Sequence, residues 1–221
     1  MFGAETVIYP PRIVDVNQLR GIIKQTPRDF MVSEILPNGQ ILDPKSEQII
    51  NLPGRSGLFL HFVLVKKDIS TESALSLLSK LWSVPINDFG IAGTKDKRAL
   101  TAQRVSLWGV RKRVEKGDLK PIDLPKIKTH SLCFRMREQR LGNLWGNKFE
   151  ITIRNLKHEE SEIREIIRAG IDEISRFGGV PNAFGYQRFG KTRPITHIVG
   201  RKLLDNNVKA AVKSYIGTVF E

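Results

Sequence analysis

An almost uninterrupted apolar run at residues 57–68 constrains the fold of this chain more than any other feature of its sequence. A strand with apolar side chains on both faces is typical of the centre of a covered sheet. Residues 70–82 then change to the spacing of an amphipathic helix, with apolar side chains at i, i+3, i+4 and i+7: Ala74, Leu77, Leu78 and Leu81. Ser70 or Thr71 can cap this helix. The sequence therefore predicts a central strand followed at once by a helix.

Further strands and helices are expected on both sides of this pair. Strand-like patterns occur at 30–36, 101–108, 131–139 and 149–156, and helical patterns at 159–177, 194–204 and 208–215. The helix at 159–177 has an isoleucine stripe that we expect to be core: Ile163, Ile166, Ile167, Ile171 and Ile174. Residues 37–57 contain several Pro and Gly and predict a long loop, and residues 1–20 predict an irregular lead-in.

The charge balance indicates a polyanionic partner. The chain has 36 Lys and Arg residues against 23 Asp and Glu, a formal net charge of +13. Such an excess favours nucleic acid, because Lys and Arg that neutralise phosphates release counterions. An anionic membrane surface is a weaker alternative. The sequence has no run of about 18 apolar residues, so we expect no transmembrane helix.

Cysteine and histidine usage argues against disulfide and metal chemistry. The single cysteine, Cys133, excludes an intrachain disulfide and fits a reducing compartment, so we expect a cytoplasmic protein. We expect Cys133 itself to be a small core residue. The four histidines are scattered without the spacing of metal ligands: His61, His130, His158 and His197. The sequence therefore predicts no metal site.

Asp96 is the leading candidate for a reacting group. It lies between two lysines and is followed by Arg98. An apolar run precedes this stretch and the predicted strand at 101–108 follows it, so we expect a turn between two strands. Turns held by a sheet often carry reacting groups, and nearby cations keep a carboxylate ionised. The alternative is a solvated polar turn, since structural ion pairs are more frequent than catalytic ones.

Glu34 is an unusual residue for a core strand. Alternation along 30–36 places it on the same face as Phe30 and Val32. Either this strand is an edge with a wet rim, or Glu34 has a cationic partner such as Lys24.

Two loops combine cations with turn residues. Residues 109–130 form a basic link, which is either a solvated loop or a phosphate contact surface: Arg111, Lys112, Arg113, Lys116, Lys120, Lys126 and Lys128. Residues 140–149 contain glycines, asparagines, Trp145 and Lys148, and such loops either approach a ligand closely or form plain turns.

Residues 180–192 match a nucleotide-binding pattern that we reject. Gly185 to Thr192 fit the P-loop consensus, but no buried strand leads into them and bulky side chains fill the inner positions. A nucleotide hydrolase therefore stays a remote alternative. The same stretch combines side-chain donors with aromatic rings: Asn182, Phe184, Tyr186, Gln187, Arg188 and Phe189. Such a set suits the binding of a base that is taken out of its stack. The alternative is an aromatic-rich turn in the core.

Several of these stretches together resemble the TruD family of pseudouridine synthases. The catalytic motif of that family is similar to residues 93–97, with Thr101 and Gln103 behind them. Its other motifs are similar to residues 24–34, 141–149 and 181–190, and residues 193–200 look most like the archaeal and eukaryotic branch. The matches follow the family's order over about residues 21–204, which makes the resemblance specific.

The resemblance implies an α+β fold with a mixed, mainly antiparallel β-sheet flanked by helices. It implies an isomerase that converts a uridine of RNA, chiefly tRNA, to pseudouridine without a metal or an organic cofactor. Asp96 matches the catalytic aspartate and Lys24 its pairing lysine, while Phe30, Asn182, Phe184 and Gln187 are expected to bind the base. Further RNA contacts are expected from a polar set: Glu34, Lys95, Lys97, Arg98, Asn147, Lys148 and Arg188.

Length is the main departure from the family. TruD enzymes are much longer, with an inserted module and returning core strands after the region matched here. We therefore expect residues 21–221 to be an incomplete catalytic domain that needs a second chain or segment and is weakly active or inactive alone. A catalytically inactive RNA-binding paralogue is the alternative.

Overall fold

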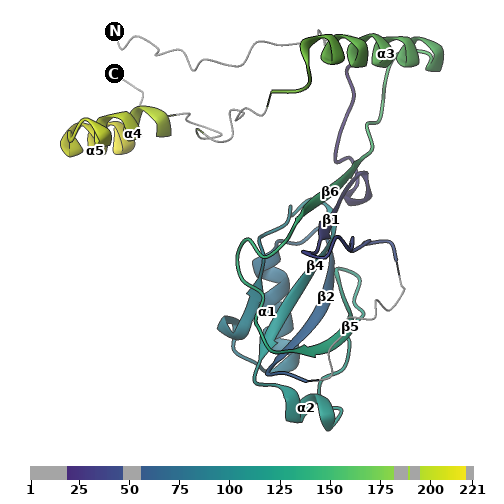
Figure 1. Cartoon of the computed structure of the whole chain (residues 1–221), viewed down its shortest axis with the longest axis vertical. Helices are drawn as coiled ribbons and strands as arrows, with labels where there is room; N and C mark the ends of the chain where they lie inside the picture. The colour runs from purple at the N-terminus through teal and green to yellow at the C-terminus, as the bar shows by residue number, and fades with distance from the viewer. Residues whose placement is uncertain (1–18, 47–55, 182–188, 190–194, 218–221) are drawn as a thin grey trace. The chain divides into compact units, whose positions relative to one another are not determined.

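The computed structural model describes residues 19–46, 56–181, 189 and 195–217 (Figure 1). Contacts divide the chain into two units. We call residues 20–157 the sheet unit, and residues 1–19 with 158–221 the helical unit. The prediction of a single catalytic domain over residues 21–221 stays a prediction.

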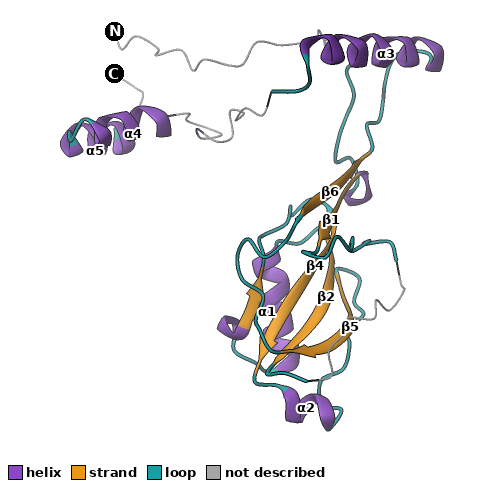
Figure 2. Ribbon diagram, in the orientation of Figure 1, coloured by secondary structure: helices purple, strands orange, loops and turns teal. Residues whose placement is uncertain are grey.

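The sheet unit is built on one mixed, six-stranded sheet (Figure 2). Its strands are β1 (Phe30–Ile35), β2 (Phe59–Lys67), β3 (Phe89–Ile91), β4 (Leu100–Trp108), β5 (Ile127–Arg135) and β6 (Gly146–Ile151). The order is β5-β2-β4-β1-β6, and β3 also pairs with β4. Among the described strands, only β1 and β4 are parallel; the other pairs are antiparallel. The predicted α+β fold with a mainly antiparallel sheet is confirmed.

Helix α1 (Thr71–Trp82) packs on one face of this sheet (Figure 1). The core between them combines alternate residues of two strands with one stripe of the helix: Leu60, Phe62, Leu64, Val105, Leu107, Ala74, Leu75, Leu78 and Trp82. Ser70 caps α1, because its hydroxyl accepts a hydrogen bond from the Ser73 amide at 3.1 Å. Leu81, predicted on the buried stripe, is 47% exposed, and Trp82 is buried instead.

The opposite face of β2 is covered as well. A second core gathers there from the strands and from the loop after β1: Met31, Leu36, Leu42, Val63, Val65, Leu100, Ala102 and Cys133. The predictions that residues 57–68 form a strand covered on both faces, and that Cys133 is a core residue, are confirmed.

The bounds of two predicted strands need correction. The strand expected at 131–139 is β5, and the strand expected at 149–156 is β6. The partner strands set the bounds of both: β5 pairs with β2 from Lys66 to Phe59, and every residue of β6 pairs with a residue of β1. Local alternation of side chains cannot supply the register set by a partner strand. The basic link at 109–130 also contains α2 (Arg111–Glu115).

The described part of the helical unit contains α3 (Glu160–Phe177), α4 (Thr196–Leu204) and α5 (Val208–Ile216), close to the predicted bounds. Asn207 caps α5 by accepting from the Ala210 amide at 3.1 Å. The isoleucine stripe of α3 was predicted to be core, but no residue of this helix is buried, and Ile171 is 57% exposed. None of the helices described is both long and apolar enough to span a bilayer.

Candidate active site

Asp96 lies in the loop that joins β3 to β4, as the sequence predicted. Its carboxylate is 42% exposed, and Oδ1 accepts a hydrogen bond from Lys24 Nζ at 2.8 Å. These two residues are 72 positions apart in the chain, so the fold brings them together. The ammonium group therefore contacts the carboxylate directly.

Phe30 completes a small cluster with this pair. The Lys24 ammonium lies 3.8 Å from the centroid of the Phe30 ring, so it contacts an aromatic face and a carboxylate together. Lys24 has a positive φ of 58°, an uncommon conformation for a residue with a side chain. Phe30 also packs edge-to-face on Phe149 of β6, with ring centroids 5.9 Å apart. The structure therefore places an exposed carboxylate, a cation and an aromatic surface side by side.

Buried hydrogen bonds tie the Asp96 loop to α1 and β4. The Thr71 hydroxyl accepts from the Lys95 amide at 3.0 Å and donates to Gln103 Oε1 at 3.3 Å. Gln103 Nε2 in turn donates to the Gly93 carbonyl at 3.2 Å. The loop is thus fixed by side chains from two regular elements, which suits a group that must be held in one position. The sequence indicated Thr71 only as a possible helix cap.

Lys66 is a buried cation beneath the loop. Its side chain is inaccessible, and Nζ donates to the Asp96 carbonyl at 2.6 Å and to the Ile69 carbonyl at 2.9 Å. Burial lowers the pKa of Lys66 to about 8, although the negative charge of Asp96 opposes the shift. Sequence reasoning missed this residue because it ends an apolar strand and its partners are backbone carbonyls.

Glu34 and Lys95 form a buried ion pair, with 3.0 Å between Lys95 Nζ and Glu34 Oε2. Their side chains are 0% and 4% exposed, and Glu34 Oε1 also accepts from the Arg104 amide at 3.1 Å. The suggested wet edge is wrong, because β1 lies between β4 and β6, and the partner of Glu34 is Lys95 rather than Lys24. Lys95 therefore turns into the protein while its neighbour Asp96 is exposed.

The other predicted site residues fall into two groups. Four are exposed, two beside Asp96 and two on β6: Lys97, Arg98, Asn147 and Lys148. Four lie outside the described residues: Asn182, Phe184, Gln187 and Arg188. Most of the rejected P-loop pattern, from Gly185 to Thr192, also lies outside them. Within the described ranges, no three His, Cys, Asp or Glu side chains gather in a way that could hold a metal ion.

Comparisons with known proteins give one consistent result. The family model of tRNA pseudouridine synthase D (TruD) matches residues 10–221. A "Probable tRNA pseudouridine synthase D" of Methanosarcina barkeri is 36% identical over 207 residues, which are 93% of this chain and 43% of that protein. A relative of the same name from Methanococcus vannielii is 34% identical over 207 residues, 93% of this chain and 50% of that protein.

A solved structure with the same family name supports the fold. This crystal structure, from Methanosarcina mazei, has a TM-score of 0.74 and 35% sequence identity, and the match covers 96% of this chain and 45% of that one. The chain thus spans about half the length of the curated relatives it matches. The family match over residues 10–221, together with these relatives, establishes that the chain belongs to the TruD family.

Proposed function

We propose that this chain carries the catalytic aspartate of a tRNA pseudouridine synthase, with Asp96 as the essential carboxylate. The observation that carries the proposal is the cluster of Asp96, Lys24 and Phe30, found in a chain of the TruD family.

The reaction defines what the site must supply. The bond from ribose C1′ to uracil N1 breaks, a bond from C1′ to C5 forms, N1 gains a proton and C5 loses one. No electrons are exchanged with an external group. Asp96, which pairs with Lys24, supplies the charged group beside the sugar and base. Phe30 supplies an aromatic face that retains the detached uracil by stacking. Asn182, Phe184 and Gln187, which lie outside the described residues, are proposed to bind the base.

RNA contacts are divided among the predicted polar residues by their exposure. Four of them are exposed and are proposed to contact the RNA directly: Lys97, Arg98, Asn147 and Lys148. The same role is proposed for Arg188, which lies outside the described residues. Glu34 and Lys95 were predicted to do the same. Their burial instead favours a positioning role, in which the ion pair holds the loop that carries Asp96.

The sheet unit has an outer strand that can accept further strands. On β6 and just after it, three apolar side chains on one face are 53%, 46% and 54% exposed: Phe149, Ile151 and Ile153. Among the described residues, β6 pairs only with β1. An open, apolar edge strand is a site for pairing with another segment. We propose that a second segment or chain, corresponding to the rest of the longer relatives, completes the catalytic domain here, and that the protein acts in the cytoplasm.

A reconstitution experiment tests this function. Unmodified tRNA transcripts would be incubated with this chain alone and with the remaining portion of the Methanosarcina mazei relative, and pseudouridines mapped by carbodiimide labelling and primer extension. We expect strong modification at a defined uridine when both are present. Binding of tRNA with no modification under either condition would instead assign the chain to the inactive RNA-binding class.

Lys66→Met should separate activity from stability. Loss of the two hydrogen bonds from Lys66 frees the Asp96 loop, so we expect kcat to fall roughly tenfold to a hundredfold while KM changes little. The cost of burying the ammonium group is removed at the same time and offsets the lost bonds. Unfolding in urea at pH 7 should therefore shift by no more than about 2 kcal/mol.

The pH dependence provides the control for this variant. The pKa of Lys66 is about 8 in the fold, below its ordinary value of 10.5, so the unfolded chain binds more protons between these values. The free energy of unfolding should thus rise from pH 8 to 10.5, by about 3 kcal/mol more in the wild type than in Lys66→Met. Parallel pH curves for the two proteins would contradict a buried, charged Lys66.

A further inference from the structure

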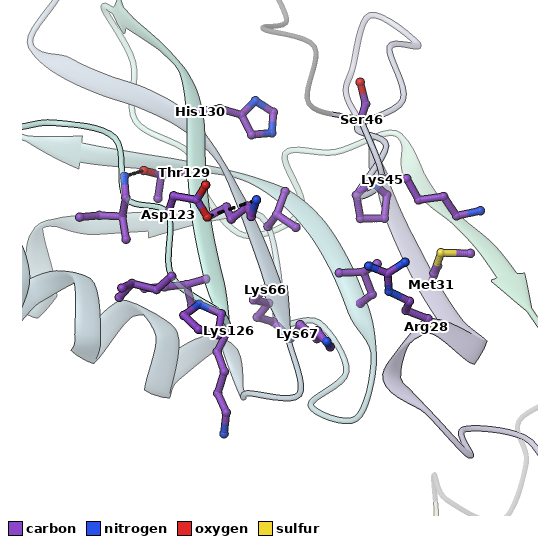
Figure 3. A pocket seen from close by; sticks show the side chains of 18 of the residues that line it. Arg28, Met31, Lys45, Ser46, Lys66, Lys67, Asp123, Lys126, Thr129 and His130 are labelled. Atoms are coloured by element: carbon purple, nitrogen blue, oxygen red, sulfur yellow. Dashed lines mark hydrogen bonds and ion pairs between the residues drawn. The ribbon is translucent and has the colours of Figure 1, made fainter.

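An open pocket of about 700 Å³ lies on the sheet face opposite α1. Its floor includes three residues of the second core, Met31, Val65 and Leu100. Residues 44–46, in the loop after β1, and residues 121–130 form its sides (Figure 3). Met31 lines the pocket, whereas its neighbour Phe30 points to the other face, towards Lys24. The pocket is therefore distinct from the Asp96 site.

Positive charge dominates the lining. Among the described residues of the lining, six cationic side chains accompany three carboxylates, and each carboxylate already has a cationic partner within 3.2 Å: Asp29 with Arg154, Glu150 with Lys45, and Asp123 with Lys128. Lys66 also borders the pocket, but its side chain turns to the other face of the sheet and donates to the Asp96 carbonyl. Arg28, Lys67 and Lys126 are exposed, and none of the described carboxylates forms an ion pair with them.

These three cations are arranged around one opening. Figure 3 shows Lys67 between Arg28 on one side and Lys126 on the other. The Lys67 amide donates to the Lys126 carbonyl at 2.9 Å, so the backbone holds the two lysines side by side. The carboxylates of the lining are paired with other cations and do not neutralise these three. The three cations are therefore suited to bind the oxyanions of a ligand.

The chemistry of the lining distinguishes phosphates from bases. Among the described residues of the lining, the one aromatic ring is that of His130, so these residues offer no Phe, Tyr or Trp surface on which bases would stack. Contacts made by flexible Lys and Arg side chains position a backbone without reading its sequence. A nucleic acid would therefore be bound here through its phosphates.

We propose that this pocket holds the phosphate backbone of the RNA substrate at a point remote from the target uridine. The inference rests on the proposed function and deepens it. Lys66 and Lys67 are neighbours on β2 that serve opposite faces: Lys66 holds the Asp96 loop and Lys67 lines the pocket. Both sites thus lie at the same end of β2, where a folded RNA can contact both by passing around the end of the strands.

Salt dependence of tRNA binding tests this proposal. Lys67→Gln with Lys126→Gln should raise the Kd for full-length tRNA about tenfold at low salt and reduce the slope of log K against log salt by about 0.7–0.9 per lost phosphate contact. The matched control is Lys80→Gln with Lys157→Gln, which removes the same charge from exposed lysines outside both the pocket and the basic link. A short oligonucleotide that carries only the target uridine should bind both variants equally.

The outcomes separate this inference from the proposed function. Equal salt slopes for the pocket variant and the control would overturn the pocket, even if tRNA is modified normally. A reduced slope in a protein that binds tRNA but forms no pseudouridine would support the pocket and count against the proposed catalysis. Unchanged thermal melts of both variants would confirm that folding is not involved.

Discussion

Replacing Asp96 by asparagine should reduce pseudouridine formation at least roughly a thousandfold, with tRNA affinity nearly unchanged. Asparagine has the size of aspartate, and its amide oxygen can still accept the hydrogen bond from Lys24. Only the negative charge is lost, and the proposed mechanism requires that charge beside the ribose and uracil. Single-turnover assays with excess enzyme, followed by mapping of the product, would measure the effect.

The position of Asp96 makes this result interpretable. The Lys24–Asp96 pair is part-exposed, so its contribution to stability is at most about 1 kcal/mol and the variant should fold normally. Asp118→Asn provides a control, because Asp118 is an exposed carboxylate outside the Asp96 loop. A turnover rate for Asp96→Asn within a few-fold of the wild type would remove Asp96 from catalysis, whatever the behaviour of Asp118→Asn.

The Asp96 loop shows how far the sequence alone could lead. Its flanking strands and the preceding helix have strong local patterns, so the position of Asp96 between β3 and β4 could be predicted. The direction of each side chain in the loop could not. Lys95 turns inward only because Glu34, 61 positions earlier, lies beneath it on β1. Such long-range pairing leaves no periodic signal.

Lys66 and α3 show two further limits. A lysine at the end of an apolar strand is normally expected to reach solvent, and the backbone carbonyls that retain Lys66 cannot be read from residue types. The isoleucine stripe of α3 correctly indicated an amphipathic helix, but a stripe does not identify what covers it. In both cases the local pattern predicted the strand or helix correctly, but contacts with distant parts of the chain determine whether its side chains are buried or exposed.

The buried Glu34–Lys95 pair should give the largest effect on stability. Lys95→Met leaves the Glu34 carboxylate in a buried site with only the more distant Arg104 charge to compensate it. Removing one partner of such a pair costs about 3–5 kcal/mol, and we expect about 3 kcal/mol here because Arg104 remains. Urea unfolding at pH 7 measures this loss. Lys97→Met, two positions along the same loop and exposed, should change stability by no more than about 0.5 kcal/mol.

A double variant distinguishes charge pairing from simple packing. Glu34→Gln keeps an oxygen that can accept from the Arg104 amide but removes the charge that Lys95 neutralises. Combined with Lys95→Met, it should recover roughly half of the lost stability, since no unpaired charge is then buried. Activity should stay low in the double variant, because the Asp96 loop has still lost its anchor on β1. A double variant that is as unstable as Lys95→Met, or that regains full activity, would contradict the positioning role given to this pair.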